Sequence, residues 1–148
     1  MQPETSSPEP SAYALAAREA KRAEAGGLGI DDAFVSDLVD DFYGRVRADP
    51  ALGPIFAARV KDWDQHLDRM KRFWRSVLFS SGEFFGNPML KHMAIPGLDR
   101  PLFDRWLLLF RQTLDDLGDA EAREHVHGKA RMIAASLLNA IEGFRARR

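Results

Sequence analysis

Histidine is the residue of this chain best suited to bind a metal, because the 148 residues include four histidines and no cysteine. Without cysteine there is no disulfide, iron–sulfur cluster or thiolate site, so a metal would be bound through His, Met, Tyr or carboxylate side chains. His92 stands on an otherwise apolar face of a short predicted helix that begins at Asn87-Pro88 and stops at Pro96. A helix of about two turns is not stable alone in water, so packing or a bound group must hold it. By this pattern alone His92 is either a half-buried structural side chain or a ligand, and the structural role is the commoner one.

A second histidine, His66, stands near the start of a predicted helix that runs from Asp62 to Leu78. Apolar side chains follow it on the same helical face. They are Met70, Phe73, Trp74, Val77 and Leu78. A stripe of this kind usually belongs to the core, so the helix by itself favours a structural His66.

Tyr43 and Trp106 are predicted to carry hydrogen-bond donors toward apolar surroundings. Tyr43 lies on the edge of the apolar face of a helix that either Asp31 or Asp32 caps. Its hydroxyl either points inward or reaches solvent while the ring packs. Trp106 lies on the broad apolar face of a helix that starts at Asp99, and a buried indole N–H needs a partner.

The apolar spacing predicts an all-α protein, and no strand pattern or internal repeat is present. Residues 1–29 are predicted to be a flexible extension with a short helix that Gly26-Gly27 ends, and residues 30–148 to form one domain. After a turn at Asp49-Pro50, Gly53-Pro54 is predicted to break the chain and to leave Phe56 in a corner.

Two long helices are predicted for the second half of the chain. The first spans 99–117, with Leu108 and Leu109 widening its apolar face so that little of its middle faces solvent. The second, of about six turns, follows Asp119. His125 and His127 near its start are predicted to be solvated, because side chains two positions apart cannot face one metal.

The charge of the chain is balanced, with 21 basic and 22 acidic residues. This balance argues against nucleic acid and membrane surfaces as partners. No apolar run is long enough for a membrane span, and the N-terminus lacks the apolar stretch of a signal peptide. We therefore expect a cytoplasmic protein.

Several short motifs together resemble the group III truncated haemoglobins, from about Ile30 to Phe144. They are Phe42-Tyr43, Asp49-Pro50 with Leu52-Gly53-Pro54-Ile55-Phe56, Trp63-x-x-His66, Phe73-Trp74, Pro88-x-x-x-His92 with Ile95-Pro96, and Trp106-Leu107. Gly26-Gly27 lies ahead of the core helix and does not match the glycine pairs of groups I and II, which favours group III. The resemblance implies a truncated globin fold, a two-over-two helical sandwich around haem b (iron protoporphyrin IX).

The resemblance also implies a role for each matching residue. His92 falls at the position of the proximal iron ligand and His66 at the distal position, where it either becomes a sixth ligand or stays back as a gate. Tyr43 and Trp106 match the polar residues of the distal pocket, and Phe56 matches the phenylalanine that stacks on the porphyrin.

Four further residues are expected to contact the cofactor. Met70 and Phe73 would supply an apolar wall. Arg69, three residues after His66, and Lys91, next to His92, would reach the haem propionates as exposed ion pairs, or are ordinary surface charges.

The implied function is a haem protein that binds oxygen, carbon monoxide or nitric oxide, as in oxygen transport. A redox reaction on the bound ligand, such as nitric oxide oxidation or peroxide reduction, would depend on an external reductase. The alternative is a haem-free helical interaction domain in which all four histidines are structural.

Overall fold

The computed structural model describes residues 11–80, 95 and 97–146 of the chain. All regular structure in these residues is helical, in agreement with the predicted all-α class. The helices are α1 (Ala12–Gly27), α2 (Asp32–Ala48), α3 (Gly53–Arg59), α4 (Trp63–Phe79), α6 (Arg100–Asp115) and α7 (Ala120–Ala146). Within the described ranges, none of the helices is long and apolar enough to cross a lipid bilayer. The predicted helix that carries His92 lies outside the described residues.

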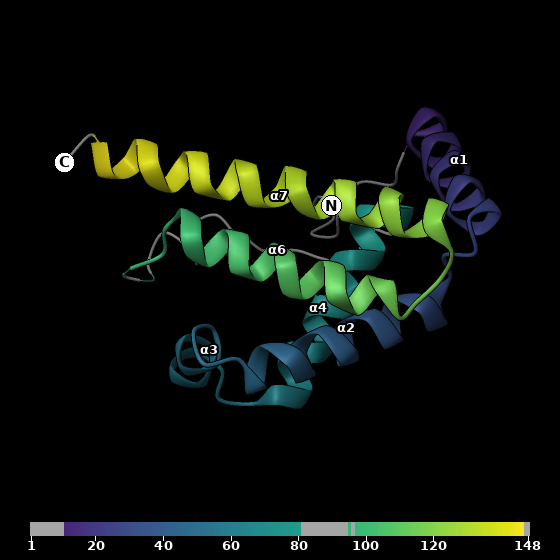
Figure 1. Cartoon of the computed structure of the whole chain (residues 1–148). Coiled ribbons are helices and arrows are strands. Elements are labelled where there is room, and N and C mark those ends of the chain that lie inside the picture. The colour runs from purple at the N-terminus through teal and green to yellow at the C-terminus, as the bar shows by residue number, and fades with distance from the viewer. Residues whose placement is uncertain (1–10, 81–94, 96, 147–148) are drawn as a thin grey trace, which may run out of the picture.

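Two pairs of helices form the two layers of the fold (Figure 1). In one layer α6 and α7 lie side by side and run in opposite directions, and in the other α2 packs on α4. α2 also contacts α6, which joins the layers. α3 follows α2 at one end of the molecule, while α1 packs on α4 at the other.

Four aspartates cap helices close to the helix starts that the sequence predicts. Asp31, Asp62, Asp99 and Asp119 each accept a hydrogen bond from the backbone N–H three residues further on, with N···O distances from 2.8 to 3.2 Å. A cap of this kind satisfies an N–H that has no partner within the helix and contributes about 1 kcal/mol. Asp31, and not Asp32, is the N-cap of α2, since Asp32 is already the first residue of the helix.

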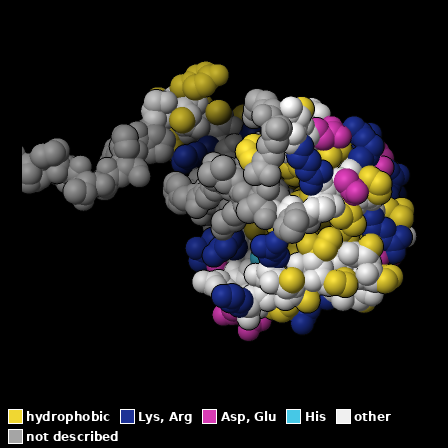
Figure 2. Space-filling model, turned by 90° about the vertical axis from the view of Figure 1, so that its left-hand side faces the viewer, with side chains coloured by type: hydrophobic (Ala, Val, Ile, Leu, Met, Phe, Trp, Pro, Cys, Tyr) yellow, Lys and Arg dark blue, Asp and Glu magenta, His cyan; other side chains and the backbone are white. Residues whose placement is uncertain are grey.

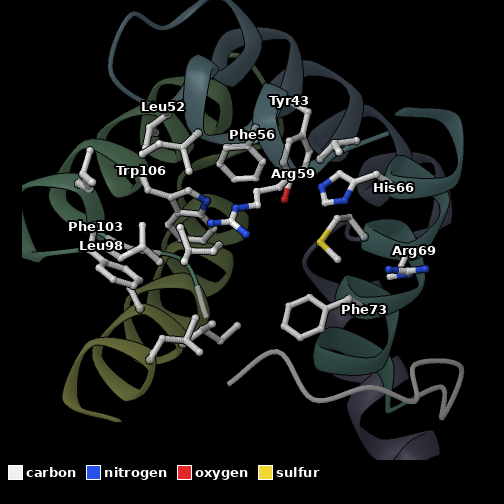
Figure 3. A pocket seen from close by; sticks show the side chains of 18 of the residues that line it. Tyr43, Leu52, Phe56, Arg59, His66, Arg69, Phe73, Leu98, Phe103 and Trp106 are labelled. Carbon is white, nitrogen blue, oxygen red and sulfur yellow. The ribbon is translucent and has the colours of Figure 1, made fainter. Parts of the chain in front are cut away.

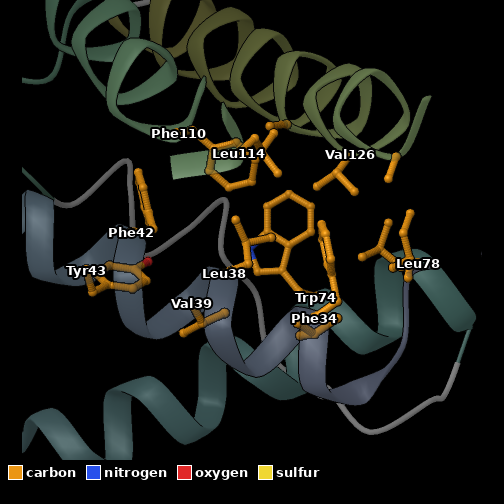
Figure 4. Close-up of a cluster of buried hydrophobic side chains, with 14 of the residues drawn as sticks. Phe34, Leu38, Val39, Phe42, Tyr43, Trp74, Leu78, Phe110, Leu114 and Val126 are labelled. Atoms are coloured by element: carbon orange, nitrogen blue, oxygen red, sulfur yellow. The ribbon is translucent and has the colours of Figure 1, made fainter. Parts of the chain in front are cut away.

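The core lies between the two layers and consists largely of the residues predicted from helical spacing (Figure 4). Phe42 of α2 and Phe110 of α6 are almost completely buried, and their ring centroids are 5.2 Å apart. Trp74 of α4 packs on Phe110 at 5.1 Å. Aromatic rings from three helices therefore meet at one point, and this contact holds together the helices that carry Tyr43, His66 and Trp106.

The prediction that Gly53-Pro54 breaks the chain is wrong, because α3 begins there. Pro54 fits the first turn of a helix, where its missing N–H is not needed. The Gly53 N–H donates to the Asp49 carbonyl at 2.8 Å, and a Cβ at Gly53 would lie only 2.9 Å from the Arg47 carbonyl oxygen. Glycine thus allows α3 to start directly against the end of α2, which places Phe56 within a helix rather than in a corner.

α1 runs through Gly26 and Gly27, although the sequence predicted that this pair would end it. The left-handed position is Gly29 instead, at φ +80°. The Ile30 N–H then donates to the Ala25 carbonyl at 2.9 Å, the closing bond that a glycine just after a helix permits.

α1 is docked on the rest of the protein through its last two turns. Ala25 is completely buried. The guanidinium carbon of Arg22 lies 4.9 Å from the ring centroid of Phe79 in α4, and the Oε1 atom of Glu24 lies 3.7 Å from the Nδ1 atom of His125 in α7. The N-terminal helix is therefore anchored by one small apolar side chain and two surface contacts.

The two long helices of the second half differ in detail from their predicted extent. α6 ends at Asp115, two residues before the predicted Leu117, and α7 has 27 residues, more than the predicted six turns. Leu108 is exposed whereas Leu109 is buried, so the predicted burial of the middle of α6 is wrong at Leu108. Successive residues of a helix differ by about 100° in direction, and Leu108 falls outside the sector that faces the core.

The prediction that His125 and His127 are solvated is also wrong. The His125 side chain is only 20% exposed, beside Glu24. The Nδ1 atom of His127 is buried and has no hydrogen-bond partner in the part of the chain described. Burial lowers the pKa of His127 below its ordinary value, and the nearby charges of Arg111 and Arg131 add to this effect.

A partly buried ion pair between Asp49 and Arg105 links the end of α2 to α6. The side chain of Asp49 is 2% exposed and accepts hydrogen bonds from the backbone N–H groups of Ala51 and Leu52 at 3.1 and 2.9 Å. The Arg105 Nε atom donates to the same carboxylate at 2.8 Å. Hydrogen bonding to Arg105 lowers the pKa of Asp49 below its ordinary value, against the opposing effect of burial.

Asp49→Asn should therefore lower the free energy of unfolding by about 1.5–3 kcal/mol at pH 7, the range for hydrogen bonds to charged groups. Because the folded pKa of Asp49 lies below the unfolded value of about 3.9, this stabilisation is present above pH 4 and is lost as the pH falls through the folded pKa. Urea unfolding of the two proteins between pH 7 and pH 3 checks both statements.

Asp68→Asn is the matched control for Asp49→Asn. Asp68 pairs with Arg72 on the surface of α4, where both side chains are more than half exposed. Its replacement should change stability by less than about 1 kcal/mol. Equal losses in the two variants, or a difference that does not shrink in acid, would contradict the assignment of Asp49.

Candidate functional site

A cavity of about 520 Å³ lies between the two layers (Figure 3). Its size falls within the roughly 300–1,000 Å³ of small-molecule and cofactor sites, and most of its lining is apolar. From the layer of α2 and α4, and from α3 and its flanking residues, the lining includes Tyr43, Leu52, Ile55, Phe56, Arg59, Val60, His66, Arg69, Met70, Phe73 and Trp74. From the other side it includes Ile95, Leu98, Leu102, Phe103, Trp106, Ile133, Ala134 and Leu137.

The cavity brings together seven of the nine residues that the sequence predicted for the site. These are Tyr43, Phe56, His66, Arg69, Met70, Phe73 and Trp106. They come from four helices, α2, α3, α4 and α6. In the sequence they extend over 63 positions, from Tyr43 to Trp106. The other two, Lys91 and His92, lie outside the described residues.

Tyr43 contributes a buried hydroxyl to the cavity. The residue is 5% exposed, and its ring stands between those of Phe56 and His66 (Figure 3). Burial raises the pKa of the phenol well above its ordinary value. The hydroxyl therefore stays neutral and keeps its proton for donation at any physiological pH.

His66 stands among aromatic rings at the wall of the cavity. Its imidazole is perpendicular to the Tyr43 ring, with centroids 5.0 Å apart, and lies 6.2 Å from the Phe56 ring. Such edge-to-face contacts restrict how the imidazole can turn. A titratable ring is thus held next to the Tyr43 ring.

Trp106 forms part of the opposite wall (Figure 3). Its indole stacks on Phe110 at 5.3 Å and meets the edge of Phe42 at 5.3 Å. The ring is therefore fixed by the core on one side and borders the cavity on the other. Tyr43 and Trp106 place two neutral donors on facing sides of one space.

Two arginines line the cavity, Arg59 of α3 and Arg69 of α4 (Figure 3). Both side chains are exposed, and neither forms an ion pair with another residue of the described ranges. No carboxylate is present among the described lining residues. Basic and apolar side chains also adjoin one another on the face shown in Figure 2. The cavity thus suits an apolar molecule that carries anionic groups.

Arg59 and much of the wall built by α6 and α7 were missed by reasoning from the sequence. The spacing of Ile55, Phe56 and Arg59 would have placed them on one helical face, but the helix was predicted to be broken at Gly53. Ile133 and Leu137 follow the spacing of an apolar face, which does not distinguish the wall of a cavity from a filled core.

Comparison with known proteins agrees with this geometry. Residues 26–139 match the family described as bacterial-like globin. Over 114 residues the chain is 31% identical to Group 3 truncated hemoglobin ctb of Campylobacter jejuni, which covers 74% of this chain and 90% of the relative. Over 119 residues it is 31% identical to Group 2 truncated hemoglobin YjbI of Bacillus subtilis, covering 76% of this chain and 87% of the relative.

A solved structure shows the same fold. The crystal structure of group III truncated hemoglobin from Campylobacter jejuni superposes with a TM-score of 0.72 at 30% identity, covering 76% of this chain and 91% of that one. The resemblance seen in the motifs is thereby confirmed in sequence and in structure. The chain belongs to the bacterial-like globin family and has the truncated globin fold, with its helices arranged two over two.

Proposed function

We propose that the cavity binds haem b and that the protein thereby takes up a small diatomic ligand such as oxygen, carbon monoxide or nitric oxide. Membership of the globin family implies haem binding. The observation that supports it here is a cavity with apolar walls, two arginines and no carboxylate among its described lining residues. Haem is a flat apolar ring with two carboxylates, so these residues fit it in both shape and charge.

Most of the contacts to haem would come from the described helices. Phe56, Met70 and Phe73 would pack on the ring and keep water from it. Arg59 and Arg69 would pair with the propionates as exposed, salt-sensitive ion pairs. Bound haem would supply an iron atom that is held by a protein side chain and can bind a small diatomic molecule.

The axial ligand is assigned to His92, with Lys91 beside it as a further partner for a propionate. Both assignments rest on the motif Pro88-x-x-x-His92 and its family resemblance, because both residues lie outside the described ranges. Tyr43 and Trp106, which line the described cavity, would donate hydrogen bonds to the small molecule.

A redox reaction on the bound ligand is the more specific form of this proposal. Nitric oxide oxidation and peroxide reduction both suit a site with neutral donors and an adjacent imidazole. Turnover would take electrons from an external reductase. A haem-free helical interaction domain is the competing proposal.

Haem titration of the purified full chain tests the proposal. One equivalent of haemin should give a Soret band that stays with the protein on gel filtration, whereas an interaction domain would elute without it. Ala134→Phe should weaken haem binding about tenfold or more, because Ala134 lines the cavity and overpacking costs roughly 1–3 kcal/mol.

Ala135→Phe is the matched control, since Ala135 is exposed and lies next to Ala134 on the other side of α7. It should bind haem as the unmodified chain does. If no Soret band stays with the protein, or if both variants bind haemin equally well, the cavity is not the haem site.

A further inference from the structure

Trp63, at the start of α4, packs against His66 but does not itself line the cavity in the described structure. Its ring centroid lies 5.5 Å from that of His66, with an interplanar angle of 83°, and 6.1 Å from that of Tyr43. Trp63 and His66 are three positions apart on the same helix, so they share a face. Trp63 thus contacts the imidazole without lining the cavity itself.

The His66 imidazole therefore contacts rings from three elements. Tyr43 of α2 lies at 5.0 Å and 90°, Phe56 of α3 at 6.2 Å and 70°, and Trp63 of α4 at 5.5 Å and 83°. Edge-to-face pairs of this kind each contribute roughly 0.5–1.5 kcal/mol beyond burial. Of the three, only Trp63 is outside the cavity wall, so it is the one that a surface residue can cover.

Arg47, in the last turn of α2, covers Trp63. Its guanidinium carbon lies 4.4 Å from the Trp63 ring centroid, within the distance of a cation–π contact. In the described ranges Arg47 forms no ion pair that would draw it away. The Arg47 carbonyl oxygen lies close to Gly53 of α3, where an added Cβ would come within 2.9 Å of it.

We propose that Arg47 and Trp63 are positioning residues that hold the His66 imidazole against Tyr43 at the cavity wall. They act through His66 and touch no ligand themselves. Where haem is bound, the same contact sets the fraction of protein molecules in which His66 is free to approach the iron. This second statement rests on the proposed function. An arginine on the outer surface thereby controls a side chain inside the site.

The first test uses the full chain before haem is added. In ¹H–¹³C NMR spectra, ring currents should displace the His66 imidazole resonances from their random-coil positions. Arg47→Gln should reduce this displacement, because losing a surface cation–π contact changes the population of the held state about two- to fivefold. Arg47→Lys keeps a cation over the Trp63 ring and should retain most of the displacement of the His66 resonances.

Arg45→Gln is the matched control. Arg45 lies in the same last turn of α2, so both variants lose one favourable charge at the helix C-terminus. Arg45 pairs with Asp116 instead of Trp63. If Arg45→Gln shifts the His66 resonances as much as Arg47→Gln does, or if neither moves them, the positioning role is refuted.

The second test uses the haem-loaded protein. Arg47→Gln and Trp63→Leu should raise the low-spin fraction of the ferric visible spectrum about two- to fivefold, since His66 is released. In a His66→Ala background the same changes should leave the spectrum as it is. A spectral change that persists without His66 would overturn the proposal. A chain that binds no haem would refute the proposed function, while the NMR result would still decide the positioning role.

Discussion

His92→Ala should deplete the purified protein of haem, or leave haem bound with an altered ferrous spectrum that added imidazole restores. The expectation follows from the position of His92 on a predicted short helix between a proline start and a proline stop, together with the family resemblance. A bond from the His92 imidazole to the iron would attach the cofactor strongly. The apolar contacts and exposed ion pairs that remain in the variant are individually weak. Visible spectra of the variant, with and without imidazole, provide the measurement.

The other histidines near the C-terminal helix supply a control for His92→Ala. His125 and His127 do not line the cavity in the described structure, so replacing both with alanine should leave the haem spectrum unchanged. Their partial burial means that the stability of this variant must be compared as well. An unchanged ferrous spectrum in His92→Ala would remove His92 from the role of ligand.

Tyr43→Phe should raise the oxygen dissociation rate about ten- to a hundredfold. The substitution removes only a buried, neutral hydroxyl, while the ring can keep its contacts with Phe42 at 5.0 Å and Phe56 at 5.7 Å. A hydrogen bond to a charged acceptor contributes roughly 1.5–3 kcal/mol, and that loss appears mainly in the dissociation rate. Carbon monoxide takes on less charge, so its release should change less. Stopped-flow ligand displacement measures both rates.

Tyr13→Phe is the matched control, because Tyr13 is the only other tyrosine of the chain and is 85% exposed.

Trp106→Phe should act in the same direction as Tyr43→Phe, since the indole borders the same cavity from α6. The double variant shows whether the two donors act on one ligand. Should oxygen leave no faster in any of the three, His66 or water must hold the ligand instead.

The amino-acid sequence by itself determined the helical class and most helix starts, and it singled out seven residues that line the cavity. Helices α4 and α6 start close to the predicted Asp62 and Asp99, which cap them, since a side-chain oxygen and an N–H three residues further on form a local interaction. Burial of Phe42 and Phe110 also followed from spacing, because one helical face must be covered. Local chemistry and periodicity are properties that a single stretch of chain carries with it.

The tertiary structure decided which apolar faces enclose a cavity and which close on one another. Ile133 of α7 and Phe110 of α6 both follow apolar spacing, yet only Ile133 borders the cavity, because that depends on what stands opposite each side chain. The start of α3 at Gly53 and the arrival of Arg59 at the site depend on how closely α3 approaches the end of α2. The contact between Arg47 and Trp63 likewise joins two helices. Such distances arise only when separate elements pack, and no local pattern of residues encodes them.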